Sequence, residues 1–133
     1  HNPVVMNEEE AHLLLEFCKE AKIEIDWDRV AKQANFVGND HDYFLQPKSE
    51  SRCVFLGENN LCKVYEHRPA SCRKYFVRSP IEACDDREGA QEVLVLADTQ
   101  AELATSGFMD IDHNKVGLLP KMLLQAKEKK NGN

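Results

Sequence analysis

The cysteines of this 133-residue chain are the feature that most constrains its fold. Cys53, Cys62, Cys72 and Cys84 are spaced as C-x8-C-x9-C-x11-C, and three of them lie in the stretch RCVFLGENNLCKVYEHRPASCRKYF. Cysteines gathered in one segment are buried as small hydrophobic side chains, joined in disulfides, or used as metal ligands. Each role requires a different arrangement of the segment, so its local structure decides between them.

Composition and charge exclude several classes of protein. The chain is 42% hydrophobic and 30% charged, which is typical of a soluble globular protein. Its 17 basic and 23 acidic side chains give a net charge of −6, so we expect no nucleic-acid partner. No apolar run approaches the roughly 20 residues of a membrane-spanning helix, so we expect no membrane partner either.

The N-terminal sequence carries two further expectations. HNPVVMNEEE has neither the basic nor the apolar region of a signal peptide, so we expect a cytoplasmic protein. The sequence begins at His1 rather than at methionine, so we expect its N-terminal part to be missing.

Local signals predict a mostly helical chain. Asn7 is followed by three glutamates, with Glu10 at the third position, and this capping-box pattern predicts a helix over about residues 8–22. The apolar stripe of this helix consists of Leu14, Phe17 and Ala21, with Leu13 and Cys18 beside it. Further helices are expected after Asp26, over residues 98–105 and 118–129, and as short turns that begin at Pro69 and Ser79.

Two other segments have different patterns. Residues 36–50 have the polar composition of a loop, with Tyr43, Phe44 and Leu45 as its anchor in the core. Residues 92–98, EVLVLAD, could form a strand or the start of a helix, and their alternating valines and leucines favour a strand.

The segment around the first two cysteines predicts a β-hairpin. CVFL and LCKVY are short β-prone runs on either side of GENN. With the loop on these four residues, Leu56 pairs with Leu61 and Cys53 faces Val64. Cys62 then lies on the same face as Cys53 and diagonal to it, at roughly 7–8 Å between Cα atoms. A shift of one residue in this register would place the two cysteines on opposite faces.

This separation favours a metal site over a disulfide. Disulfides prefer Cα separations of about 4.4–6.8 Å, and the chain has an odd number of cysteines and no visible export signal. Two thiolates at the longer distance can converge on one ion with bonds near ~2.3 Å. We therefore predict that Cys53, Cys62, Cys72 and Cys84 are metal ligands, with disulfides and burial in the core as the alternatives.

Arg68 and Arg73 lie on either side of Cys72 and are predicted to surround the metal site. Four thiolates on a divalent ion have a net charge of −2, which guanidinium groups and backbone N–H donors compensate. His67 could act as a ligand or a hydrogen-bond donor, but we expect a histidine on a surface turn. Cys18, in the middle of an amphipathic helix, is expected in the core, with ligand or redox partner as alternatives.

The central segment resembles the signature of the YkgJ-like cysteine-cluster family, roughly C-x-F-L…C-x-I/V-Y-E-x-R-P-x-x-C-R. The matching residues are Cys53, Phe55, Leu56, Cys62, Val64, Tyr65, Glu66, Arg68, Pro69, Cys72 and Arg73. The resemblance covers about residues 4–84 and implies a zinc, iron or Fe–S cofactor, with no defined reaction. It also implies a further C-x-x-C-C cluster before the segment that matches Val4–Met6. The chain departs from the family after Cys72-Arg73, where family members often have Tyr-Pro and this chain has Lys74-Tyr75-Phe76.

Together these observations predict one small domain over residues 1–133, mainly α with a small β-hairpin, irregular and stabilised by metal. Residues 118–133 form its C-terminal helix and tail. The predicted function is metal binding through a thiolate site that holds zinc, iron or an Fe–S cluster. The alternatives are an enzyme or enzyme accessory in redox or protein-modification chemistry, with another protein as partner, and a thiol–disulfide switch.

Overall fold

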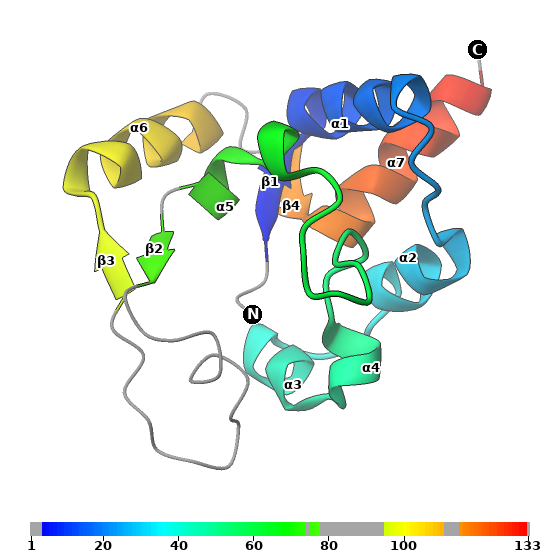
Figure 1. The fold of residues 1–133 in the computed structure, drawn as a ribbon, viewed down its shortest axis with the longest axis horizontal. Coiled ribbons are helices and arrows are strands. Elements are labelled where there is room, and N and C mark those ends of the chain that lie inside the picture. Colours follow the sequence, from blue (N-terminus) through cyan, green and yellow to red (C-terminus); the bar gives the residue numbers. More distant parts are fainter. Residues whose placement is uncertain (1–3, 74, 78–94, 111–114, 133) are drawn as a thin grey trace.

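The structure is a computed structural model, and it describes residues 4–73, 75–77, 95–110 and 115–132. Within these ranges the chain is mostly helical with small antiparallel sheets, as expected from the sequence (Figure 1). Its helices and strands are β1 (Val5–Asn7), α1 (Glu8–Glu20), α2 (Trp27–Ala34), α3 (Asp40–Leu45), α4 (Lys48–Ser51), η1 (Tyr65–His67), α5 (Ala70–Arg73), β2 (Tyr75–Val77), β3 (Val95–Ala97), α6 (Thr99–Asp110), β4 (Val116–Leu118) and α7 (Leu119–Asn131). Cys84 and the short helix predicted at Ser79 lie outside the described residues.

Helix α1 begins as its sequence predicts. The Asn7 side chain accepts a hydrogen bond from the Glu10 N–H at 2.9 Å, and the Glu10 carboxylate accepts one from the Asn7 N–H at 3.1 Å. These reciprocal bonds satisfy two donors that a helix N-terminus leaves free. The helix buries Ala11, Leu14 and Cys18. Leu13, which was expected on the apolar face, is 65% exposed, so that part of the prediction was wrong.

One hydrophobic core joins elements from both ends of the chain. Helix α7 packs against α1 and α2, and Figure 1 shows it beside α1. The core consists of Met6, Ala11, Leu14, Cys18, Val30, Val54, Phe55, Val64, Leu119, Met122, Leu123 and Ala126. Because Val54, Phe55 and Val64 belong to it, the cysteine-rich segment is attached to the core by its apolar residues.

Two small antiparallel sheets complete the fold. Strand β1 pairs with β4, with Met6 opposite Gly117, and β2 pairs with β3, with Phe76 opposite Leu96. The strand predicted over residues 92–98 is therefore confirmed for Val95–Ala97, and its first residues lie outside the described part of the chain. The β1–β4 pairing holds the segment before α1 against the segment before α7.

The segment around Cys53 and Cys62 reverses direction as predicted, but in a different register. Leu56 forms a single antiparallel bridge with Cys62, not with Leu61. Asn60 has a positive φ of 61° at the end of the turn, a conformation that asparagine adopts more readily than most residues. On either side of the bridge the chain forms turns and the 3-10 helix η1 instead of strands. The predicted diagonal placement of Cys53 and Cys62 on one sheet face was therefore wrong.

Residues 36–50 were predicted as a loop, but most of them are helical. Helices α3 and α4 lie in this segment, and the Asn39 side chain caps α3 by accepting from the Asp42 N–H at 3.0 Å. Tyr43 is buried, as expected of a core anchor, whereas Leu45 is 71% exposed. Helices this short have little intrinsic stability, so the sequence pattern alone did not reveal them.

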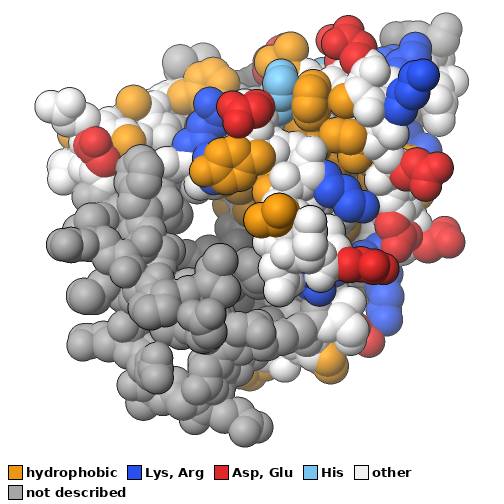
Figure 2. Space-filling view, in the orientation of Figure 1, with side chains coloured by type: hydrophobic (Ala, Val, Ile, Leu, Met, Phe, Trp, Pro, Cys, Tyr) orange, Lys and Arg blue, Asp and Glu red, His pale blue; other side chains and the backbone are white. Residues whose placement is uncertain are grey.

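On the face that Figure 2 shows, the acidic, basic and hydrophobic side chains of the described residues are interspersed. No helix within the described ranges is both long and apolar enough to cross a membrane.

Candidate metal centre

Cys53 begins a tight turn that directs backbone N–H groups to its side chain. The Leu56 N–H donates to the Cys53 carbonyl at 3.0 Å, which closes the turn. Burial raises the pKa of the Cys53 thiol, whereas hydrogen bonding from the Phe55 and Leu56 N–H groups lowers it in part. Backbone donors to sulfur favour the thiolate and are common around metal-bound cysteines.

Arg52, immediately before Cys53, connects the two halves of the cysteine segment. Its guanidinium donates to the Gly57 carbonyl and, at 2.8 Å, to Oδ1 of Asn60. Both acceptors lie in the turn that precedes Cys62. A single side chain therefore fixes the position of this turn relative to Cys53.

Side chains of helix α2 donate hydrogen bonds to the backbone at and before Arg52. The Gln33 side-chain amide donates to the Arg52 carbonyl at 2.8 Å and to the Glu50 carbonyl at 2.6 Å. The guanidinium of Arg29, one turn earlier on α2, also donates to the Arg52 carbonyl. Gln33 is 6% exposed, so these bonds are shielded from water. The backbone entering Cys53 is thus fixed by a buried network rather than by a sheet.

Cys72 is positioned by contacts with the N-terminal elements. It lies on the short helix α5, whose first N–H, that of Ala70, donates to Oε1 of Glu10 at 2.7 Å. The Ser71 hydroxyl donates to the Val5 carbonyl in β1. The Glu10 carboxylate therefore caps α1 and anchors α5 at the same time, and this joins Cys72 to the N-terminal sheet.

The three described cysteines of the cluster are close enough to act on one another electrostatically. Burial, and then Cys53 and Cys62, raise the pKa of the Cys72 thiol to about 12, while Arg68 lowers it. Cys62 likewise raises the pKa of Cys53, and Arg29 lowers it. All three cysteines are half-buried and free of disulfides. The fold therefore gathers Cys53, Cys62 and Cys72 from a turn, a bridge and a helix into one region.

In the described ranges, no three His, Cys, Asp or Glu side chains are arranged as a group that could hold a metal ion. The chemistry of the region nevertheless fits a thiolate-bound cation. Nε of Arg29 and Nε of Arg52 are buried and have no hydrogen-bond partner among the described residues. Buried donors of this kind are rare and require an acceptor. Sulfur atoms carrying the negative charge of a metal–thiolate group are suitable acceptors.

Arg68 and Arg73, the two arginines predicted around the metal, have different environments. Arg68 lies 3.7 Å over the Tyr65 ring, and it is the arginine whose charge lowers the pKa of Cys72. Arg73 donates to the carbonyls of Arg68, at 2.8 Å, and Glu66, and so closes the loop between η1 and α5. Both arginines also line a surface hollow of about 380 Å³.

Cys18 and His67 have the positions expected from the sequence. Cys18 is 2% exposed in the core, and burial raises the pKa of its thiol. His67 is exposed and stacks on Phe17, with 3.6 Å between ring centroids and 14° between ring planes.

Arg29 and Tyr43 are neighbours of the cluster that sequence reasoning did not assign to it. Each of them interacts electrostatically with Cys53. The charge of Arg29 lowers the pKa of Cys53, and the pKa of Tyr43 is raised by burial and then by Cys53. The sequence indicates only weakly that Arg29 faces the interior, because Arg29 shares one face of α2 with Gln33 and the buried Val30. The hydrogen bonds of Arg29 and Gln33 to the Arg52 carbonyl are tertiary contacts, and no local pattern predicts them.

Comparison with protein-family models relates the chain to a known family. Residues 15–99 match the family model CxxCxxCC, described as "Putative zinc- or iron-chelating domain". The matched range contains all five cysteines of the chain, including Cys84, but the run C-x-x-C-x-x-C-C does not occur in the 133 residues. Neither the curated proteins nor the solved structures gave a match.

Proposed function

This chain belongs to the CxxCxxCC family, and on that premise we propose that it binds zinc or iron through the thiolates of Cys53, Cys62, Cys72 and Cys84. The observation that carries the proposal is the family match over residues 15–99, a range that contains all four cysteines. Without a cation, half-buried thiols gathered in one region resist ionisation. A bound cation would reverse that preference, because it would stabilise the thiolates together.

The residues around the cysteines have distinct parts in this proposal. Backbone N–H groups of Phe55 and Leu56 stabilise the Cys53 thiolate, and Arg29 and Arg68 supply positive charge. Zinc would stabilise the fold without redox chemistry, whereas an iron–sulfur cluster would transfer electrons, with another protein as donor or acceptor. The free thiols are suited to a reducing compartment, which supports a location in the cytoplasm.

The metal is identified by purifying the protein without oxygen and measuring zinc, iron and sulfide together with the visible spectrum. Stoichiometric iron and sulfide with absorbance near ~400 nm indicate a cluster. One zinc per colourless chain indicates a structural zinc site. Metal-free protein after this gentle preparation contradicts the proposal, and disulfides formed reversibly by a mild oxidant would then favour a thiol–disulfide switch.

The ligands are identified by substitution. We expect Cys62→Ser and Cys72→Ser each to lower the bound metal and the stability of the fold. Cys18→Ala is the matched control, because it removes a buried thiol of the same chain without placing a hydroxyl in the core, and it should leave the metal content unchanged. Loss of metal from Cys18→Ala alone would show that the ligand set is wrong.

A further inference from the structure

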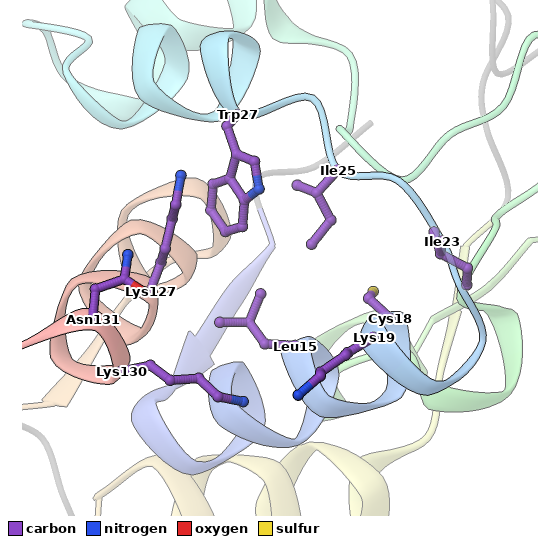
Figure 3. Close-up of a pocket in the computed structure, with 9 residues that line it drawn as sticks. All are labelled: Leu15, Cys18, Lys19, Ile23, Ile25, Trp27, Lys127, Lys130 and Asn131. Carbon is purple, nitrogen blue, oxygen red and sulfur yellow. The ribbon is translucent and has the colours of Figure 1, made fainter. Parts of the chain in front are cut away.

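A second site lies between the C-terminal ends of α1 and α7 and the segment that joins α1 to α2. This pocket has a volume of about 250 Å³, and its floor is apolar (Figure 3). The floor consists of Leu15, Cys18, Ile23, Ile25 and Trp27. Hollows with apolar floors and a few polar groups at the rim are the usual form of small-molecule sites, and this volume suits a ligand smaller than a typical drug.

Three lysines gather at the rim of the pocket, and no acidic residue is among the described residues that line it. Lys127 lies with Nζ 4.0 Å over the Trp27 ring, and Figure 3 shows the amines of Lys19 and Lys130 directed toward one another from α1 and α7. Within the described residues none of the three forms an ion pair. Lys129 and Lys32, by contrast, are paired with Glu8 and Glu50.

The charge of the chain makes this grouping informative. Acidic side chains outnumber basic ones by 23 to 17, so a lysine has many carboxylates with which to pair. The negative end of a helix dipole accounts for a single lysine at the C-terminal end of α1 or α7. It does not account for two ammonium groups directed at one another, because like charges repel. An anion between them would relieve this repulsion, and the apolar floor would accommodate the rest of the molecule.

We propose that this pocket binds a small organic carboxylate with an apolar body of about the size of a six-membered ring. The carboxylate lies between Lys19 and Lys130, and the apolar body rests on Ile25 and Trp27. Inorganic anions lack the apolar part, and neutral molecules of the same shape lack the charge. The site is separate from the cysteine cluster and does not depend on a bound metal.

Trp27 is the only tryptophan of the chain, so its fluorescence reports directly on the pocket. The probe is cyclohexanecarboxylate, which is transparent where tryptophan absorbs; cyclohexylmethanol and inorganic phosphate are the comparison compounds. We expect a saturable change of Trp27 fluorescence with the carboxylate at a Kd of about 1 mM, and none with the other two. An equal response to the alcohol, an equal response to phosphate, or no saturable response to the carboxylate would each overturn the proposal.

Substitutions test the lysines. Lys19→Ala combined with Lys130→Ala should weaken binding of the carboxylate at least tenfold, and because both side chains are exposed the fold should persist. Lys129→Ala removes a single charge from the same end of α7, but its amine is paired with Glu8 outside the pocket, so binding should not change. Equal loss in both variants would show that only the general charge of the helix end matters.

Discussion

The side-chain amide of Gln33 donates a hydrogen bond of 2.8 Å to the carbonyl of Arg52, although the two residues are 19 positions apart. The same amide reaches the carbonyl of Glu50 at 2.6 Å. One buried side chain therefore satisfies two carbonyls of the backbone that leads into Cys53. In a segment with a single bridge instead of strands, this contact replaces the hydrogen bonds that a sheet would supply.

Replacing Gln33 should destabilise the fold. Gln33→Leu keeps the volume of the side chain but removes the side-chain donor to the Glu50 carbonyl and one of the two donors to the Arg52 carbonyl, which costs about 1–3 kcal/mol of unfolding free energy. Urea denaturation of the metal-free protein measures this loss of unfolding free energy. Lys32→Ala on the same helix breaks only the exposed pair with Glu50 and should cost less than about 1 kcal/mol. Similar losses in the two variants would contradict a special role for Gln33.

Replacing Arg29 should weaken metal binding. Arg29→Met keeps the apolar stem but removes the charge that lowers the pKa of Cys53 and the buried Nε donor. Changes of this kind next to metal ligands reduce affinity by about 10–100-fold. Titration with a competing chelator measures the affinity, and Lys32→Met, also on α2, is the matched loss of charge. An unchanged affinity in Arg29→Met would mean that the thiolates do not need this arginine.

Replacing Glu10 should loosen the element that carries Cys72. Glu10→Ala removes both the capping box of α1 and the acceptor for the Ala70 N–H. Loss of such a cap costs about 0.5–2 kcal/mol, and we expect weaker metal binding as well. Hydrogen exchange of the Ala70 amide should accelerate. Glu9→Ala is the control, because Glu9 also lies in the first turn of α1 but is exposed. Equal effects from Glu9→Ala would point to helix charge alone.

The stability of the metal-free protein should fall at alkaline pH. Burial and the neighbouring cysteines raise the folded pKa of Cys72 from 9.0 to about 12, so the folded state holds this proton more firmly than the unfolded state does. The resulting stability is fully present below pH 9 and is lost as the pH rises toward 12. Thermal unfolding across this range measures it, and Cys72→Ser should flatten the dependence. A wild-type profile as flat as that of the variant would show that this thiol is not shielded.

Much of the fold follows from local signals, because caps and apolar stripes act over a few residues. Asn7 with Glu10, and Asp26 as the cap of α2, predicted where these helices begin. The register around Cys62 was not predictable in this way, since Asn60 adopts a positive φ and moves the bridge by one residue. The surroundings of Cys53 depend on Arg29 and on Tyr43, which only the folded chain brings close. The ligand set, including Cys84, stays a prediction.

The pairing of β1 with β4 has a consequence for how the protein is made. The Leu119 N–H donates to the Val4 carbonyl at 2.8 Å, and α7 then covers α1 and α2. Cys53, Cys62 and Cys72 all precede α7 in the sequence, so they leave the ribosome before the helix that completes the core exists. Nascent chains stopped before Leu119 should therefore react with alkylating reagents at all three thiols, and the finished chain more slowly. During synthesis we therefore expect these three thiols to stay reactive until α7 has left the ribosome and packed on α1 and α2.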